Sequence, residues 1–479
     1  MNIVQNGASR RDFLKGTAWM LGAAAAAGCS IDKVCFSSCG SMANFAVPPM
    51  EKVRVGFIGI GERGFAAVRR VNLFPGIETA ALCDLRAEAV AEAREWLKNN
   101  NKPGAMHEYK GKDDSWKGLC DDPQVDVVYI AAPAGLHVEM ELYAMRAGKH
   151  VMCEVPGARR IEECWEIVET SEKTRRHCMM LENCCYGETE MLAWNLVHMG
   201  LLGKITHAEG GYIHNLTERS LADHFRNRHK KASLYFSEYG NTYPTHPLGP
   251  ICFYMDMNRG DKMDYLVSVS SNEAGWSEYI KETFGPEDWQ SKLKFDKCDM
   301  NTTIIKTALG RTIMLQLDKA TPRPYSRINL VQGSKGCFAD YPPRLAITKR
   351  SGTHAGWMGE KAFAEARKKY MHPLWKQVGQ AAKTLGGHGG MDFIMDLRWV
   401  YCLQNGLPLD MDVYDLASWS SIVPCSAKSC RNMGERVEIP DFTRGAWKNA
   451  KPIHIGDIDL KKMGFDPDKV KKDDKQLSV

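Results

Sequence analysis

The sequence has no large excess of charge of either sign. Its 63 Lys and Arg residues against 58 Asp and Glu residues leave a formal net charge of +5 over 479 residues. Residues 1–28 account for +2 of this, so the rest of the chain carries only +3. Proteins that bind nucleic acid have a clustered basic patch or stripe. So small and scattered an excess argues against nucleic acid as a partner.

Beyond the N-terminus, the chain also lacks an apolar run long enough to span a membrane. The first 28 residues instead have the composition of a targeting signal. Ser9–Lys15 (SRRDFLK) resembles the twin-arginine export signal, and an Ala-rich apolar stretch follows at Gly16–Gly28. Ala26–Cys29 (AAGC) resembles a lipoprotein box, so Cys29 is a candidate lipid-bearing residue. The alternative is a plain exported protein cut near the Ala run. Either way, we expect a location in the periplasm or at the membrane surface.

Cysteine spacing gives no sign of a metal site. Of the 16 cysteines, Cys425 and Cys430 are too far apart to form a CxxC pair, and we predict no structural metal. Cys83, Cys153 and Cys178 lie in apolar, strand-like runs, which favours buried thiols. Twin-arginine export carries proteins already folded in the reducing cytoplasm, so the cysteines are not interpreted as a disulfide framework.

The chain is too long for one typical domain, and its composition is that of a globular protein, with 44% hydrophobic and 25% charged residues. We predict a targeting segment at 1–28, a linker at 29–50, a first domain at 51–188, a second domain at 189–455 and a charged, solvated tail at 456–479.

Strand and helix patterns alternate after residue 50. Apolar runs typical of buried parallel strands occupy Val53–Gly59, Thr79–Asp84, Val125–Pro133, His150–Val155 and Cys178–Glu182. Helical patterns occupy Glu62–Val71, Ala87–Lys98, His137–Ala147 and Ile161–Thr174. This alternation predicts an α/β fold with a doubly wound parallel sheet, the Rossmann arrangement.

After about residue 190, strand-like segments follow one another with little helix between them. They are Thr206–Ile213, Tyr265–Ser270, Thr302–Thr307 and Thr312–Leu317. This texture predicts a mixed or antiparallel sheet in a second, α+β domain. A helix is expected at Gly390–Leu403, after the glycine-rich loop Gly386–Gly390.

The first strand runs into the pattern Gly59-x-Gly61-x-x-Gly64, and a helix follows. In this context the glycines permit a tight turn and close approach of the backbone to a pyrophosphate. Asp84 ends the next strand, where its carboxylate accepts hydrogen bonds from a ribose 2′-hydroxyl and repels a 2′-phosphate. The pattern therefore predicts NAD rather than NADP, although Arg86 lies close by.

Later strands of such a sheet end at the same crevice, which adds candidate cofactor contacts. The further candidates are Glu62, Arg63, Gly135, His137, Glu154, Val155 and Asn183. His137 is equally well interpreted as a helix-start capping residue, and for this residue alone we favour that interpretation.

At one of these strand ends, a valine takes the place of a lysine. Glu154-Val155-Pro156 stands where many nicotinamide-dependent sugar oxidoreductases have Glu-Lys-Pro, whose lysine handles the proton of the alcohol being oxidised. Valine cannot transfer a proton. Either the protein is a dehydrogenase without its base, or its chemistry differs from simple alcohol oxidation.

These residues and the domain order resemble the Gfo/Idh/MocA oxidoreductases over most of the chain. Three motifs resemble glycoside hydrolase family 109 more closely: HCMMLENCCY (177–186), NTYPTHPLGP (241–250) and GGHGGMDF (386–393). Members are exported NAD-dependent glycosidases, typified by α-N-acetylgalactosaminidases. The resemblance implies hydrolysis of terminal N-acetylgalactosamine-type glycosides. Hydride leaves C3 of the sugar, a base removes the C2 proton, the glycosidic bond is eliminated, water adds at C1, and the hydride returns.

The resemblance also implies which residues touch the sugar. It places substrate contacts at Tyr212, Arg228, Tyr243, Pro244, Thr245, His246 and Tyr325. Pro244 stiffens its loop, so that neighbouring side chains are held in fixed geometry. We predict that His246 is the main proton-transfer residue and that Tyr243 assists it or binds substrate. Arg228 lies in a basic run that also fits a solvated loop, and His388 is a candidate to close on the site.

Two other functions stay open: a self-recycling sugar oxidoreductase and a non-catalytic NAD-containing sugar-binding protein. The missing lysine argues against the first, and the Tyr243 and His246 pair argues against the second. Export supports a closed cycle, because an exported protein meets almost no soluble NAD and a simple dehydrogenase would stop after one turnover. A homo-oligomer is a candidate state, since sheet surfaces in this superfamily often pair.

Overall fold

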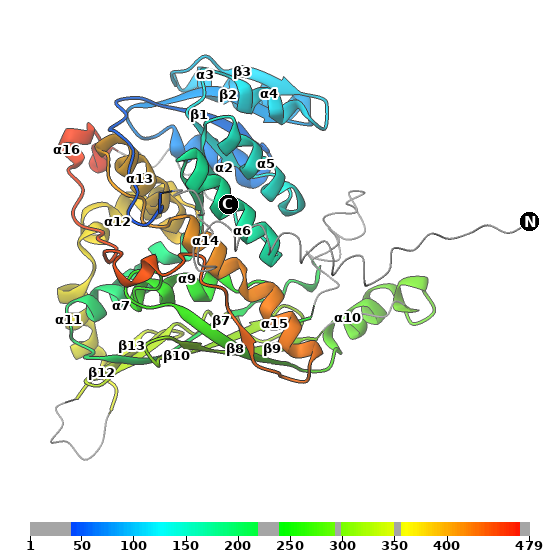
Figure 1. Ribbon diagram of the computed structural model, residues 1–479, viewed down its shortest axis with the longest axis vertical. Helices are drawn as coiled ribbons and strands as arrows, with labels where there is room; N and C mark the ends of the chain where they lie inside the picture. The colour runs from blue at the N-terminus through cyan, green and yellow to red at the C-terminus, as the bar shows by residue number, and fades with distance from the viewer. Residues whose placement is uncertain (1–39, 219–238, 293–297, 349–355, 470–479) are drawn as a thin grey trace, which may run out of the picture. The chain divides into compact units, whose positions relative to one another are not determined.

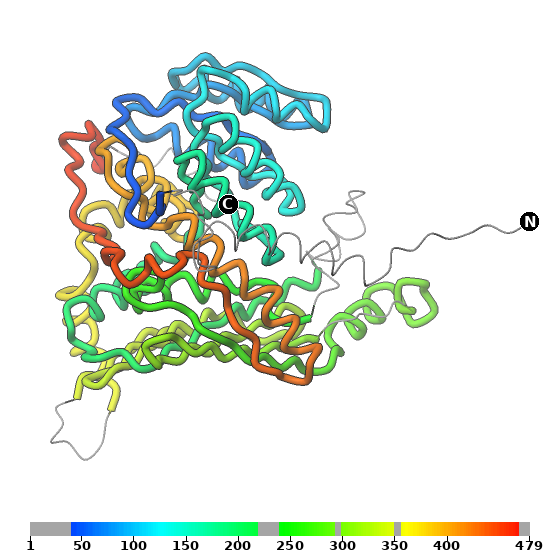
Figure 2. Tube along the Cα trace, in the orientation of Figure 1, coloured from blue at the N-terminus to red at the C-terminus, as the bar shows by residue number. Residues whose placement is uncertain are grey.

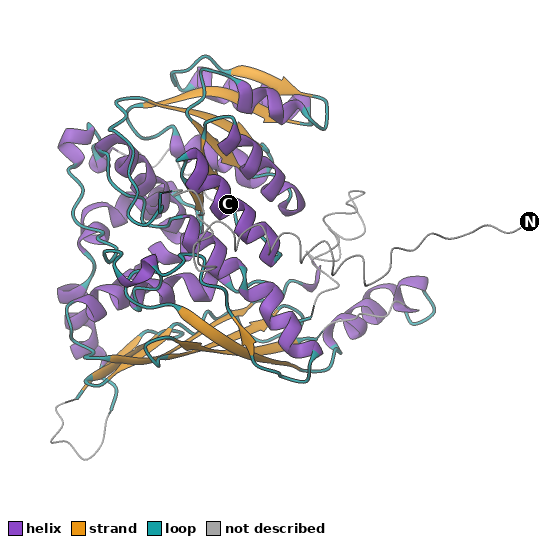
Figure 3. Ribbon diagram, in the orientation of Figure 1, coloured by secondary structure: helices purple, strands orange, loops and turns teal. Residues whose placement is uncertain are grey.

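The computed structural model describes residues 40–218, 239–292, 298–348 and 356–469. From Ser41 onward the chain forms one compact unit built on two sheets, with helices around the first and against one face of the second (Figure 1, Figure 3). The predicted export signal, Cys29 and Arg228 lie outside the described residues. No helix in the described ranges is both long and apolar enough to cross a membrane.

The first sheet has six parallel strands and confirms the predicted α/β arrangement. In chain order the strands are β1 (Val53–Ile58), β2 (Ile77–Asp84), β3 (His107–Lys110), β4 (Val127–Ile130), β5 (His150–Cys153) and β6 (Cys178–Met180). Their order across the sheet is β3-β2-β1-β4-β5-β6, and every neighbouring pair is parallel. The strand order reverses between β1 and β4. In such sheets ligands bind in the crevice at this switch point.

Four of the five described helices of this half begin where the sequence patterns place them. They are α2 (Glu62–Val71), α3 (Ala87–Asn99), α4 (Ser115–Asp121), α5 (His137–Arg146) and α6 (Ile161–Thr174). The sequence patterns missed β3 and α4. The β3 sequence, HEYK, is polar because it forms an edge strand with no fully buried side chain, so no apolar run marks it.

The second sheet has eight strands and is mixed, as predicted. Its strands are β7 (Ile205–Ile213), β8 (Met263–Ser270), β9 (Met300–Thr307), β10 (Thr312–Asp318), β11 (Leu330–Gly333), β12 (Gly336–Ala339), β13 (Arg344–Ile347) and β14 (Val437–Glu438). Their order is β13-β12-β11-β7-β10-β9-β8-β14, and only β7 and β10 pair in parallel. That central pair aligns Tyr212 with Leu317.

Helices fill the space between the two sheets. Those of the second half are α7 (Glu188–His198), α9 (Thr245–Tyr254), α10 (Gly275–Phe284), α11 (Glu360–Tyr370), α12 (Pro373–Leu385), α13 (Met391–Asn405), α14 (Val413–Ser420), α15 (Ile422–Arg431) and the short α16 (Leu460–Met463). The helix α9 packs on β7, whereas α13 packs back against α2 and β1 of the first half. This crossing brings the GGHGGMDF motif to the nucleotide-binding half.

The predicted linker and the predicted tail both contribute buried residues to the core. In the predicted linker, Met42 is buried and its N–H donates to the Tyr414 hydroxyl at 3.0 Å. In the predicted solvated tail, Met463 and Phe465 are buried, and the Phe465 ring lies 6.0 Å from that of Phe393 in α13. The red end of the Cα trace accordingly runs beside the gold segment that forms α13 (Figure 2). Between residues 456 and 469 the apolar Ile458, Met463 and Phe465 are buried, whereas charged residues such as Asp457 and Lys461 are exposed. Scattered apolar residues among the charges pack onto the core.

Candidate active site

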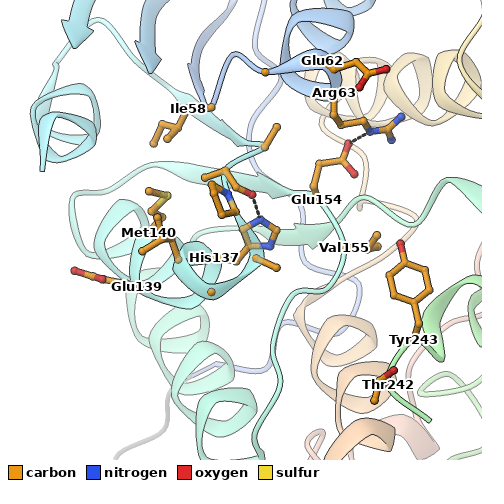
Figure 4. Close-up of a pocket in the computed structure, with 18 of the residues that line it drawn as sticks. Ile58, Glu62, Arg63, His137, Glu139, Met140, Glu154, Val155, Thr242 and Tyr243 are labelled. Atoms are coloured by element: carbon orange, nitrogen blue, oxygen red, sulfur yellow. Dashed lines mark hydrogen bonds and ion pairs between the residues drawn. The ribbon is translucent and has the colours of Figure 1, made fainter. Parts of the chain in front are cut away.

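A cavity of about 1620 Å³ lies where the strands of the first sheet end, and residues of both halves line it (Figure 4). Most of the predicted contacts are on its wall: Gly59, Gly61, Glu62, Arg63, Asp84, Gly135, His137, Glu154, Val155, Asn183, Tyr212, Tyr243 and His246. Gly64, Pro244, Thr245 and Tyr325 are not among the lining residues. The structure thus brings the predicted cofactor side and the predicted sugar side together in one space.

The glycine turn has the shape that a dinucleotide needs. Gly59 has φ +85°, and a Cβ there would stand 2.6 Å from the Ala131 carbonyl oxygen. A Cβ at Gly64 would stand 1.7 Å from the Gly59 oxygen, so Gly64 serves close packing of helix on strand rather than ligand contact. Gly61 faces open space, with its nearest neighbour 3.9 Å away on Arg86. Its missing side chain leaves room at the N-terminus of α2 for a pyrophosphate.

Asp84 lies beside this turn as predicted. Its Oδ2 accepts the Ile60 N–H at 2.7 Å, and its Oδ1 accepts the Arg86 N–H at 2.9 Å and the Arg86 Nε–H at 3.2 Å. Arg86 also donates to the Ile60 carbonyl oxygen at 3.2 Å. The Arg86 guanidinium is thus paired with the Asp84 carboxylate rather than free to bind a phosphate. This pairing favours a ribose 2′-hydroxyl over a 2′-phosphate. These residues fit NAD.

Asn183 provides a second test of that fit. Its Nδ2 donates to Asp392 Oδ1 at 2.6 Å, whereas its buried Oδ1 accepts no hydrogen bond within the described part of the chain. A buried acceptor without a donor costs free energy. Since Asn183 is on the cavity wall, the carboxamide N–H of a nicotinamide has the chemistry to satisfy this atom.

His137 lies on the cavity wall, as a cofactor contact would, but its ring faces backbone carbonyl groups. It is 2% exposed, with Nδ1 2.9 Å from the Pro156 oxygen and Nε2 2.7 Å from the Ala132 oxygen. Its side chain does not cap α5 either. Burial lowers the pKa of His137, against the backbone hydrogen bonds that raise it. Each ring nitrogen faces a backbone carbonyl oxygen, and the N–H of the neutral ring donates to one of them, so His137 packs between the β4–α5 turn and the turn after β5.

Arg63 forms two ion pairs that sequence reasoning missed, and the one with Asp392 links the two halves of the protein. Its Nε contacts Glu154 Oε1 at 2.6 Å and its Nη1 contacts Asp392 Oδ2 at 2.5 Å. Asp392 is buried, and Arg70 lies 3.8 Å from the same oxygen. Burial alone would raise the pKa of Asp392, but the charges of Arg63 and Arg70 hold it well below its usual range. The GGHGGMDF motif was the signal, since Asp392 is its acid.

The predicted proton-transfer pair has a third member. His246 Nε2 is 3.4 Å from the Tyr243 hydroxyl oxygen, and His246 Nδ1 is 2.7 Å from Glu182 Oε1. Glu182 is completely buried, and the same oxygen accepts the Cys184 N–H at 3.1 Å. Burial would raise the pKa of Glu182, but the His246 ring and hydrogen bonds outweigh it and hold the pKa below its ordinary value. The sequence signals for Glu182 were its place at a strand end in the same crevice and its position within the HCMMLENCCY motif.

Aromatic rings complete this side of the cavity. The Tyr212 ring centroid lies 4.7 Å from that of Tyr243 and 5.4 Å from that of His246. His214, which was not predicted, stacks on Tyr212 and meets the Tyr325 ring edge-on. Tyr325 is 44% exposed and accepts a hydrogen bond from Arg327 at 2.9 Å. Tyr325 thus adjoins the wall without lining it.

Glu182, Cys184 and His246 also offer three metal-ligating atoms within 4.8 Å of one another. The carboxylate already accepts a hydrogen bond from His246, and burial raises the pKa of the Cys184 thiol well above its ordinary value. Both features favour a hydrogen-bonded network over a metal centre. The absence of a metal stays a prediction.

Comparison with known proteins defines the class first. Residues 53–182 match the family model of the oxidoreductase family, NAD-binding Rossmann fold. A levoglucosan dehydrogenase in complex with NADH and levoglucosan superposes with a TM-score of 0.60 at 20% identity, over 81% of this chain and 100% of that one. An aldose–aldose oxidoreductase from Caulobacter crescentus gives 0.56 at 16% identity. These likenesses show the fold, and with the glycine turn they define an NAD-binding protein of the Gfo/Idh/MocA type.

The second half of the chain identifies the family within this class. Residues 186–449 match the model of the glycosyl hydrolase 109 C-terminal domain. A glycosyl hydrolase family 109 protein of Shewanella sp. strain ANA-3 is 42% identical over 94% of this chain and 99% of its own length. An α-N-acetylgalactosaminidase of Shewanella oneidensis is 43% identical over 88% of this chain and 91% of its own. The chain belongs to glycosyl hydrolase family 109 and is an NAD-dependent glycoside hydrolase.

Proposed function

We propose that this enzyme releases terminal α-linked N-acetylgalactosamine by a cycle of oxidation, elimination, water addition and reduction. The observation that carries the proposal is that Tyr243 and His246 face the same cavity as the NAD-binding turn, with the buried Glu182 behind His246. The Shewanella oneidensis relative, named an α-N-acetylgalactosaminidase, supports this choice of sugar.

NAD, when bound, supplies the hydride acceptor and donor for C3 of the sugar, while the proton of the C3 hydroxyl passes to solvent on oxidation and returns from solvent on reduction. The chain must then move protons, and His246 has the required geometry. A carboxylate only accepts hydrogen bonds, so the Nδ1 atom that faces Glu182 carries a proton and Nε2 is left as the basic atom. In the proposal, Nε2 removes the C2 proton as the C1–oxygen bond breaks. After that proton has exchanged with solvent and water has added at C1, Nε2 delivers a proton back to C2.

Tyr243 and Glu182 assist His246 in different ways. The Tyr243 O–H, 3.4 Å from His246 Nε2, is assigned to protonate the departing oxygen. Glu182 holds the imidazole in one tautomer and stabilises its positive charge once Nε2 has taken a proton. Val155 takes no part in proton transfer, and Glu154 beside it is paired with Arg63. Transfer of the C2 proton is therefore assigned to His246.

The test is a screen of purified protein against nitrophenyl α- and β-glycosides without added NAD. Release of nitrophenol from the α-N-acetylgalactosaminide, with no net NADH produced, is the expected result. Activity on no glycoside, together with hydride exchange between two free sugars, would instead indicate the self-recycling oxidoreductase.

We also propose twin-arginine export and a lipid anchor at Cys29, on the basis of Ser9–Lys15 and Ala26–Cys29. Cell fractionation with Arg10→Lys/Arg11→Lys tests the route, with retention in the cytoplasm expected. Labelling with a fatty-acid analogue tests the anchor, and Cys29→Ala should abolish the label.

A homo-oligomer formed through the open face of the second sheet is a further part of the proposal. Val269 and Ile304 on adjoining strands of this sheet are 64% and 46% exposed, which is unusual for apolar side chains on a free surface. Light scattering coupled to gel filtration measures the mass directly. Val269→Lys should shift an oligomer toward the monomer.

A further inference from the structure

The sugar side of the cavity continues past Tyr243. In Figure 4 the Tyr243 side chain reaches toward Val155, and Thr242 lies on its other side, away from the nucleotide-binding residues. Three polar residues line this part of the wall: Thr242, Asp299 and Lys319. Neither the glycine turn nor the proposed proton transfer uses them. The whole cavity measures about 1620 Å³, whereas a pocket for one drug-sized ligand has roughly 300–1,000 Å³, so there is room for more than one ligand.

Lys319 follows the last residue of β10, and its neighbours hold it in place. Asp318 Oδ1 accepts the Ala320 N–H at 3.1 Å, and the Lys319 carbonyl oxygen accepts the Leu216 N–H at 3.0 Å. The Lys319 side chain is half-buried, and its Nζ donates to the Thr242 hydroxyl oxygen at 3.0 Å. An ammonium group has three N–H donors. This one therefore lies on the cavity wall against the residue that directly precedes the tyrosine.

The first turn of α10 places Asp299 beside this lysine. A Cβ on Gly275 would stand 2.4 Å from the Ala320 carbonyl oxygen, so the turn packs tightly against the residue after Lys319. Asp299 Oδ2 accepts the N–H groups of Ala274 and Gly275 at 2.8 Å and 2.9 Å. Its buried Oδ1 accepts no hydrogen bond within the described part of the chain. A buried acceptor without a donor costs free energy, which a hydroxyl group of a ligand would offset.

The position of this wall indicates which part of a substrate meets it. Tyr243 is assigned to protonate the departing oxygen, and the aglycone is the group bonded to that oxygen. The nucleotide-binding residues lie on the Val155 side of Tyr243, which leaves the Thr242 side for the aglycone. Lys319 provides donors and Asp299 provides an acceptor, and the hydroxyl groups of a sugar ring both donate and accept. This lining therefore suits a second sugar.

We propose that the wall formed by Thr242, Asp299 and Lys319 is the aglycone subsite, and that Lys319 and Asp299 bind hydroxyl groups of a second sugar there. The substrate class is then an oligosaccharide from which the terminal sugar is released. Lys319 and Asp299 select for the sugar to which that terminal residue is attached. The inference rests on the proposed function and adds to it the chemistry of the leaving group.

The test measures binding to holoenzyme loaded with NADH, which cannot accept the first hydride, so the glycoside stays intact. Titration calorimetry compares methyl α-N-acetylgalactosaminide with a disaccharide that has the same terminal sugar α-linked to a hexose. Lys319→Met should weaken binding of the disaccharide roughly ten-fold to a hundred-fold more than binding of the methyl glycoside, the range expected when a hydrogen bond to a charged group is lost. Asp299→Asn, which replaces an acceptor by a donor, should act in the same direction.

Lys306→Met is the matched control, because Lys306 lies in the same sheet, donates to the Gly310 carbonyl oxygen at 2.6 Å and does not line the cavity. It should bind both ligands as the unaltered enzyme does. An equal effect of Lys319→Met on both ligands, or no effect on either, would overturn the proposal. So would a loss seen only with a threonine peptide that carries N-acetylgalactosamine, which would indicate a peptide aglycone. If the unaltered holoenzyme binds neither ligand, the choice of sugar is wrong and both proposals fall, a result that no effect of a variant can mimic.

Discussion

Glu182 Oε1 lies 2.7 Å from His246 Nδ1, and the carboxylate is completely buried behind the ring. A group in this position sets which ring nitrogen carries the proton. The cavity-facing Nε2 is therefore left without that proton, which suits the proton transfer that we propose for it. This pair connects β6, the last strand of the NAD-binding sheet, to the start of α9 in the second half.

Glu182→Gln should lower kcat by roughly 10²–10⁴-fold while KM changes little and NAD stays bound. The glutamine amide can present N–H to Nδ1, which moves the ring proton to Nε2 and removes the base. The pH profile of kcat should shift as well, which loss of packing alone would not cause. Glu172→Gln is the control, because Glu172 is a buried carboxylate that pairs with Tyr414 and Arg444 away from the cavity. An equal loss of kcat in both variants would mean that Glu182 is only structural.

Turnover in D₂O should place deuterium at C2 of the released sugar, since elimination requires loss of the C2 proton. Mass spectrometry or NMR of the product detects it. His246→Ala should reduce hydrolysis by about 10²–10⁴-fold, with NAD still bound. A product without deuterium, when exchange is not shielded from solvent, would indicate direct displacement by carboxylates instead.

Gly61→Ala should fold normally but bind NAD poorly. A Cβ at this position meets no protein atom closer than 3.9 Å, so the methyl group occupies the space that the pyrophosphate needs. Denatured protein is assayed for released nicotinamide nucleotide, and thermal unfolding of the cofactor-free form checks the fold. Gly359→Ala, where a Cβ also meets nothing, should keep its full NAD content. Normal NAD content in Gly61→Ala would place the cofactor elsewhere.

Glu141 should make the protein less stable as pH rises. Burial raises the pKa of this fully buried carboxyl to about 8, against a smaller effect of the Cys153 thiol. The pKa of Glu141 is higher in the folded state than in the unfolded state. Its contribution to the free energy of unfolding is therefore fully present below about pH 4.3 and is lost as pH rises through about 8. The slope in that window is about 1.4 kcal/mol per pH unit.

Glu141→Gln removes this titration, so its melting temperature should fall less than that of the unaltered protein between pH 5 and pH 8. Calorimetry of the cofactor-free protein at both pH values measures the difference. Parallel curves for the two proteins would show that Glu141 is already charged in the fold.

Sequence patterns predicted the elements whose signals are local. The helices α2 and α6 have the predicted bounds, because their apolar spacing and flanking turns lie within one stretch of chain. The glycine turn was recognisable for the same reason, since each glycine meets a steric limit set by neighbouring residues. The strand β3 was missed because its polar edge position leaves no apolar run to detect.

The sequence by itself determined the NAD-binding turn, the two-domain order and the Tyr243 and His246 pair. Only the tertiary structure decided which charged side chains pair with the residues of the turn and with His246. Arg63 meets Asp392 across 329 positions of chain, and His246 meets Glu182 across 64. No local spacing records such pairs, because they form only when α13 packs on α2 and α9 meets the end of β6. The physical reason is burial: a carboxylate removed from water is stable only beside the donors that the fold brings to it.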